Sequence, residues 1–73
     1  MQQPIQVRFG RHLRQLRIKA GKTVEKIAYE SEEDMSKSTV SRVENGLVDP
    51  RLSTLEKIAL SLEVSLPELM DFK

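Results

Sequence analysis

The segment SKSTVSRVENG, residues 36–46, has the pattern of a short helix with two chemically different faces. Ser36 is a residue type that caps helix N-termini, so we expect the helix to begin there. At about 100° per residue, Val40, Val43 and, one turn further, Leu47 lie on one side. The opposite side carries short hydroxyl groups and cations rather than the usual glutamate and lysine mixture: Lys37, Ser38, Ser41, Arg42 and Asn45.

A face of this composition fits the major groove of DNA. Short side chains let the helix backbone approach the groove wall, lysine and arginine suit O6 and N7 of guanine, and serine pairs with either kind of base edge. Taken alone, the pattern also fits an ordinary capped helix in water, because serine is common at such positions. The neighbouring segments distinguish these two interpretations.

Helical patterns precede this segment. We expect a first helix between Pro4 and Gly21, which are residue types typical of helix starts and ends. We expect a second helix to begin at Thr23, a favourable N-cap. The spacing predicts these inward-facing residues: Phe9, Leu13, Leu16, Ala20, Val24, Ile27 and Ala28.

The last third of the chain predicts two more helices. Residues 53–56 and 65–68 have the pattern of capping boxes, in which a serine and a glutamate satisfy each other's helix-end amides. Residues 45–50, NGLVDP, predict a loop. No strand pattern occurs, so the expected fold is all-α: five short helices in a single domain over residues 1–73. The expected inward-facing residues of the last two helices are Leu55, Ile58, Ala59, Leu62, Val64 and Leu69.

The composition argues against several classes of protein. The chain has no cysteine and one histidine, which argues against disulfides, a metal cluster and catalysis, so no cofactor is expected. No apolar run is long enough for a membrane span, and we expect a cytoplasmic protein.

Charge is unevenly distributed along the chain. Residues 1–22 carry six cations and no acid, whereas residues 23–36 carry five acids and one lysine. This asymmetry favours an anionic partner. The arginines alone also fit solvated helix faces, and four cations lie off the first apolar stripe and are expected in water: Arg8, Arg11, Arg14 and Lys19.

Three segments in this order, TVEKIA, SKSTVSRVENG and DPRLSTLEKIALSLEVSLPEL, resemble the phage-repressor helix-turn-helix family (lambda-repressor-like, Cro-type or Xre-type). The resemblance runs from about Phe9 to Met70. It implies a compact five-helix DNA-binding domain with its helix-turn-helix at about residues 23–45. It also implies a sequence-specific regulator of transcription, more a repressor than an activator, that reads a palindromic double-stranded operator as a homodimer. Such a protein would be associated with a bacterial nucleoid or encoded by a phage.

The resemblance also implies roles for individual residues. It assigns base contacts to Lys37, Ser38 and Arg42, with Ser41 on a base or a phosphate. It pairs Arg17 with Glu44 as a structural ion pair between the first and third helices. The implied phosphate contacts are Thr23, Ser36, Asn45, Arg51 and Ser53, and the implied dimer contacts are Leu66, Met70 and Phe72.

The chain departs from the family pattern next to the third helix. The turn before Ser36 is two residues longer than in most relatives, and residues 29–35, YESEEDM, are strongly acidic. Val24 also stands where many relatives have a DNA-contacting glutamine. Acids in this turn would weaken non-specific DNA binding; alternatively, one could accept from cytosine N4, or residues 30–34 could contact a partner protein.

A protein-interaction module of the same fold, such as an antitoxin or a polymerase adaptor, is the alternative function. That module would depend on the acidic turn or the last helix, whereas a DNA-binding regulator would depend on Lys37 and Arg42.

Overall fold

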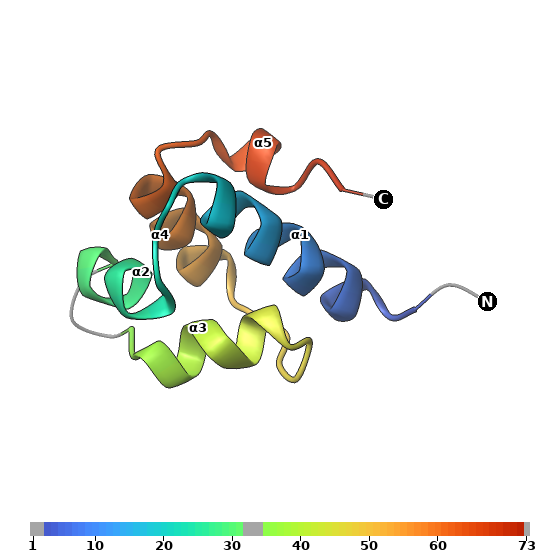
Figure 1. Ribbon diagram of the computed structural model, residues 1–73. Helices are drawn as coiled ribbons and strands as arrows, with labels where there is room; N and C mark the ends of the chain where they lie inside the picture. Colours follow the sequence, from blue (N-terminus) through green and yellow to red (C-terminus); the bar gives the residue numbers. More distant parts are fainter. Residues whose placement is uncertain (1–2, 32–34, 73) are drawn as a thin grey trace.

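The computed structural model describes residues 3–31 and 35–72, and its regular secondary structure is entirely helical. The helices are α1 (Ile5–Lys19), α2 (Val24–Glu30), α3 (Lys37–Glu44), α4 (Leu52–Leu62) and α5 (Leu66–Leu69), as Figure 1 shows. The five-helix all-α fold predicted from the sequence is therefore confirmed.

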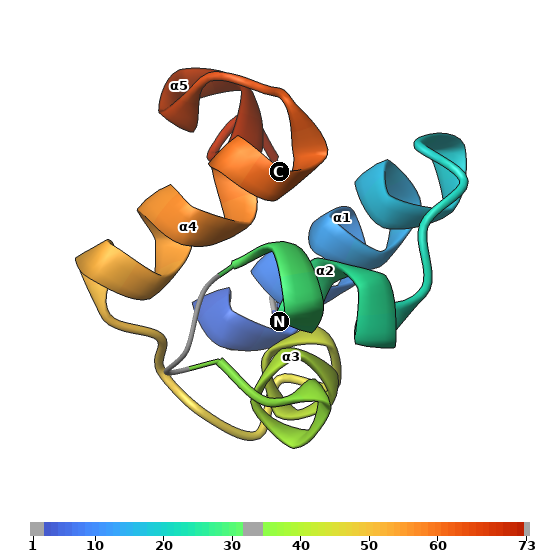
Figure 2. The ribbon, with the colours of Figure 1, turned by 90° about the vertical axis from the view of Figure 1, so that its left-hand side faces the viewer.

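Helices α3 and α5 lie at opposite ends of the molecule, with α1 and α4 between them, in both Figure 1 and Figure 2. Helix α2 packs against α3 and α4, α1 packs against α3, and α4 packs against α5. One side of α3 is thus covered by α1 and α2, while its other side faces outward.

The core contains residues from every helix. Leu13, Ile27, Val40, Ile58 and Leu69 are fully buried, and Phe9, Ala28, Val43, Leu55, Ala59 and Leu62 complete the cluster. Most of the predicted inward-facing residues are therefore correct. The exceptions are exposed or partly buried: Ala20 is exposed, and Leu16, Val24 and Val64 are only partly covered.

Three of the four predicted N-caps have the expected hydrogen bonds. Thr23 accepts from the amide of Lys26 and Ser36 from the amide of Thr39, each at 3.1 Å. At the start of α5, Ser65 and Glu68 satisfy each other's backbone amides.

The predicted capping box at Ser53 is wrong. Helix α4 begins at Leu52 and its N-cap is Arg51, with no side-chain cap hydrogen bond. Ser53 is therefore inside the first turn, because the sequence pattern locates a helix start only to within a residue or two.

The predicted inward position of Leu47 is also wrong, since this side chain is 71% exposed. Helix α3 ends at Glu44, with Asn45 as its C-cap and Gly46 in the left-handed region at φ 70°. The helical spacing that placed Leu47 beside Val43 no longer applies beyond that turn.

Helix α2 extends further into the acidic segment than the sequence suggested, because Tyr29 and Glu30 belong to it. The Glu30 carboxylate lies 2.7 Å from the Lys22 ammonium and accepts from the Ser61 hydroxyl at 3.0 Å. The hydrogen bonds from Lys22 and Ser61 lower the pKa of Glu30. Glu30 therefore joins the end of α2 to the end of α4, while Glu32, Glu33 and Asp34 lie outside the described residues.

Helices α1 and α3 approach each other backbone to backbone at Gly10. A methyl group at this position would lie 2.5 Å from the Val43 carbonyl oxygen and closer still to that of Glu44. Neither oxygen is on a flexible side chain, so a larger residue requires the two helices to separate.

We predict that Gly10→Ala lowers the free energy of unfolding by about 2 kcal/mol or more, because overpacking outweighs the gain of about 1 kcal/mol in helix propensity. Gly21→Ala is the matched control. Gly21 has φ 72° with no atom within 4 Å of an added methyl, so only the backbone cost of about 1 kcal/mol applies. Urea denaturation measures both losses. A smaller loss for Gly10→Ala than for Gly21→Ala would contradict the close approach.

Candidate nucleic-acid interface

The outward side of α3 brings together the four residues expected to contact bases. We call Lys37, Ser38, Ser41 and Arg42 the recognition face. Lys37, Ser38 and Arg42 are exposed and Ser41 is partly covered. All four line one shallow depression.

Two residues from the first turn of α2, Val24 and Glu25, line the same depression. Thr23 caps α2, so the helix begins at Val24, and α2 packs against α3. From the sequence, Val24 was expected in the core and Glu25 was given no role in binding. The position of Val24 in the binding surface could have been inferred from the sequence, because many relatives have a DNA-contacting glutamine there.

The predicted phosphate contacts at helix starts already have structural roles. The hydroxyl oxygens of Thr23 and Ser36 accept from amides of their own helices. The Thr23 hydroxyl accepts with its oxygen, so its hydrogen can still be donated to a phosphate oxygen. The Ser36 hydroxyl also forms a hydrogen bond with the Thr39 hydroxyl, at 3.1 Å, in which either group can be the donor.

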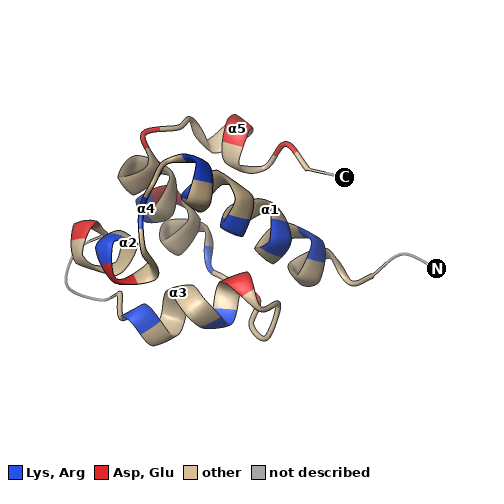
Figure 3. Cartoon of the chain, in the orientation of Figure 1, with Lys and Arg blue, Asp and Glu red and all other residues tan. Residues whose placement is uncertain are grey.

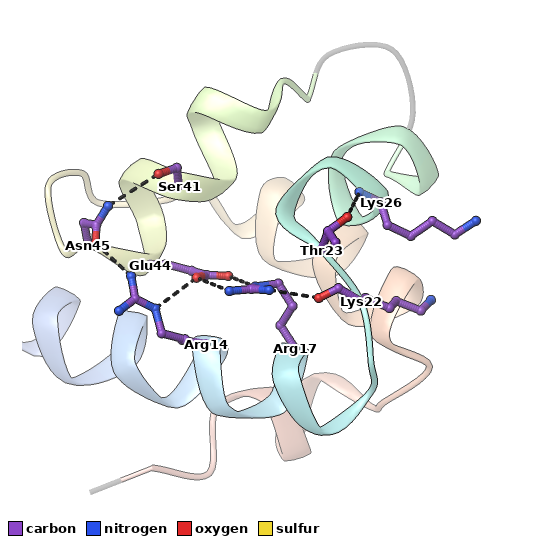
Figure 4. Close-up of polar contacts among 8 residues, drawn as sticks. All are labelled: Arg14, Arg17, Lys22, Thr23, Lys26, Ser41, Glu44 and Asn45. Carbon is purple, nitrogen blue, oxygen red and sulfur yellow. Dashed lines mark hydrogen bonds and ion pairs between the residues drawn. The ribbon is translucent and has the colours of Figure 1, made fainter.

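Both polar atoms of the Asn45 side chain already form hydrogen bonds within the protein. Its carbonyl oxygen accepts from the Arg14 guanidinium at 3.0 Å, and its amide nitrogen lies 3.4 Å from the Ser41 hydroxyl (Figure 4). Asn45 thereby links α1 to the recognition face.

A second depression places Arg51 and Ser53 beside Arg42. It also includes Lys57 of α4, a partly buried cation that the sequence interpretation missed. Lys57 follows Ser53 by one helical turn, and this spacing was the available signal. Arg42 lines both depressions and therefore joins the recognition face to the start of α4.

The Glu44 carboxylate, at the inner end of α3, is only 2% exposed and has two arginine partners (Figure 4). Arg17 contacts it with two nitrogens, Nε at 2.5 Å and Nη2 at 3.1 Å. Arg14, which the sequence placed in water, is 49% exposed and lies 3.3 Å from the same carboxylate.

Arg17 also fixes the turn before α2. Its Nη1 donates to the backbone carbonyl of Lys22 at 2.9 Å, next to the Thr23 cap. One guanidinium therefore holds both the end of α3 and the beginning of α2. This pairing positions the two helices that form the depression.

Cations and acids are unevenly distributed over the surface of the molecule. Figure 3 shows lysine and arginine along α1 and α3, and acids on α5 and its flanking segments, on α2 and at the end of α3. The cations of α3 favour an anionic partner, while Glu25 of α2 lies beside them and opposes it.

The expected dimer residues lie on or after α5. Leu66 and Met70 are 38% and 40% exposed. Phe72 packs on its own chain, with its ring centroid 5.6 Å from that of Phe9 and 5.7 Å from that of His12. Met70 and Phe72 border an apolar groove together with Ile5, which is 57% exposed.

Within residues 3–31 and 35–72, we found no group of three or more acidic or histidine side chains placed to hold a metal ion. In the same part of the chain, no helix is both long enough and apolar enough to cross a membrane.

Comparisons with known proteins agree with this geometry. The chain matches the family described as a helix-turn-helix domain over residues 8–72. It is 35% identical over 69 residues to control protein C.BamHI of Bacillus amyloliquefaciens, covering 93% of this chain and 83% of that protein.

Two solved structures are also similar. The restriction-modification controller protein C.AhdI from Aeromonas hydrophila has a TM-score of 0.83 and 34% identity, covering 89% of this chain and 96% of that one. The hypothetical transcription factor NHTF from Neisseria has a TM-score of 0.81 and 25% identity, covering 92% of this chain and 75% of that one.

We predict that Arg17→Met costs about 3 kcal/mol of folding free energy, because it removes the main partner of a buried carboxylate. Arg14→Met is the matched control and should cost about 1 kcal/mol or less, since Arg14 is half exposed. Urea denaturation measures both variants. Similar losses would contradict the dominant role of Arg17.

Proposed function

The chain belongs to the helix-turn-helix domain family, and we propose that it is a sequence-specific, double-stranded DNA-binding regulator of transcription that acts as a dimeric repressor. The observation that carries the proposal is the recognition face: hydroxyl groups and cations project from a helix whose other side is buried and whose end is fixed by an ion pair. Such a helix can enter the major groove as a rigid body. We place this activity in the bacterial cytoplasm.

The similarity to C.AhdI supports a more specific role. That relative is a restriction-modification controller protein that aligns with nearly the whole of this chain. We propose that this protein likewise controls the genes of a restriction-modification system.

The cations and the serines of the recognition face would contact different groups on the bases. Arg42 and Lys37 donate to O6 and N7 of guanine, and Ser38 and Ser41 pair with whichever base edge they meet. Phosphate contacts come from the surrounding surface and fix the position of α3 in the groove. The proposed phosphate contacts are Thr23, Ser36, Asn45, Arg51 and Ser53, together with Lys57.

Dimerisation through α5 is compatible with this mode of binding. Leu66 and Met70 lie at the end of the molecule away from α3, so a contact between two copies there leaves both recognition faces free. A two-fold axis would place the two α3 helices about 34 Å apart, in successive major grooves of a palindrome.

Glu25 gives this surface a means of limiting non-specific binding. Glu25 lines the same depression as Lys37 and Arg42. Repulsion between this carboxylate and the phosphates weakens binding to any sequence, whereas correct base contacts compensate for it only at the operator. The acids at 32–34 would add to this effect.

Selection from a random pool of DNA duplexes at about 150 mM salt tests the function, since purely electrostatic binding is weak there. We expect an enriched palindrome with half-sites about 10 base pairs apart. Failure of the folded protein to enrich any sequence would refute the proposal and favour a protein-interaction module.

We predict that Arg42→Ala weakens binding to the enriched operator by about 1–3 kcal/mol and relaxes the preference at one base position. Arg11→Ala is the control, because it removes the same charge from a surface shared with Asp71 and Phe72, near the C-terminal segment. Binding is measured on the operator and on every single-base variant of it. Uniform weakening across all sequences would instead assign Arg42 to a phosphate.

A further inference from the structure

We propose that Val24 selects a thymine in the operator by packing its methyl groups against the C5 methyl of that base. This inference rests on the proposed DNA-binding function and adds one specificity-determining residue to the recognition face. The residue comes from α2, whereas the four side chains of the recognition face come from α3.

The position of Val24 carries the first step. It is the first residue of α2, and it is partly buried where it packs against the core. Val24 also lines the depression that contains Lys37, Ser38, Ser41 and Arg42. A base edge held by those polar side chains would therefore meet Val24 as well.

The chemistry of valine carries the second step. Its side chain neither donates nor accepts hydrogen bonds, so a polar base edge placed against it would lose water without compensation. In the major groove, the apolar group on the four natural bases is the C5 methyl of thymine. Contact with that methyl is the favourable use of a partly buried valine at this position.

The rigidity of the site carries the third step. Thr23 caps α2, and Arg17 holds the preceding carbonyl of Lys22, so the backbone of Val24 is fixed on its N-terminal side. The β-branched side chain itself has few rotamers. Little conformational freedom of Val24 would be lost when DNA binds. The gain in binding free energy from a small apolar contact would then not be offset by a loss of entropy.

Deoxyuridine scanning tests the inference. Each thymine of the enriched operator is replaced in turn by deoxyuridine, which keeps the base pairing and removes only the methyl group. We expect one position in each half-site at which deoxyuridine weakens binding of the wild-type protein about fourfold relative to thymine. This is the effect expected from losing the burial of one methyl group. With Val24→Ala, the same replacement should change binding by less than about twofold.

Two controls distinguish loss of the methyl contact from an effect of the substitution on protein folding. Val24→Ser is a second variant in which the methyl contact is lost, and deoxyuridine should again have less than about twofold effect at that position. The wild-type scan requires no variant, so it gives a result even if both variants are unstable.

The outcomes distinguish the inference from the function on which it rests. Absence of any enriched sequence would refute both. An enriched operator with no deoxyuridine-sensitive thymine would overturn the role of Val24 alone. A sensitivity that Val24→Ala retains would overturn it too, because another residue would then make the methyl contact.

Discussion

The buried carboxylate of Glu44 is the interaction on which the arrangement of the binding surface depends. A charge that is 2% exposed requires close partners, and Arg17 supplies two hydrogen bonds to it from α1. The same guanidinium binds the carbonyl of Lys22 immediately before α2. Because Glu44 ends α3 and Lys22 precedes α2, one arginine fixes both helices of the helix-turn-helix. The relative orientation of Val24 and the recognition face follows from this pairing.

The apolar core holds the helices together, and the ion pair between Arg17 and Glu44 sets how α1 and α3 are oriented relative to each other. Apolar contacts are non-directional, so they allow α1 and α3 to pack in more than one register. The bidentate pair and the backbone approach at Gly10 permit one register only, because the first requires a fixed fork geometry and the second allows no side chain. A small domain buries little apolar surface, so its core alone does little to determine the position of a helix. The ion pair and the close approach at Gly10 are therefore important for the position of α3.

The sequence predicted the features that depend on local pattern, while those that depend on tertiary neighbours were missed. The helices, the caps at Thr23, Ser36 and Ser65, and most of the core follow from residue type and spacing. Leu47 and the start of α4 were misplaced because pattern alone defines helix ends poorly. Glu25 and Lys57 were missed because their relevance arises only when α2 and α4 are packed beside α3. Arg14 was assigned to water for the same reason, since its partner Glu44 is 30 positions away.

The shortness of α3 sets a limit on how much sequence information one subunit can use. Eight residues provide four outward side chains, so the recognition face could address at most about four base pairs of a half-site. In the proposed dimer, two such faces would distinguish roughly 65,000 sequences, fewer than the ~10⁶ or more competing sites in a genome. The proposed regulator would obtain the remaining information elsewhere: from Val24 of α2, from the fixed spacing between half-sites and from the deformability of the bases between them.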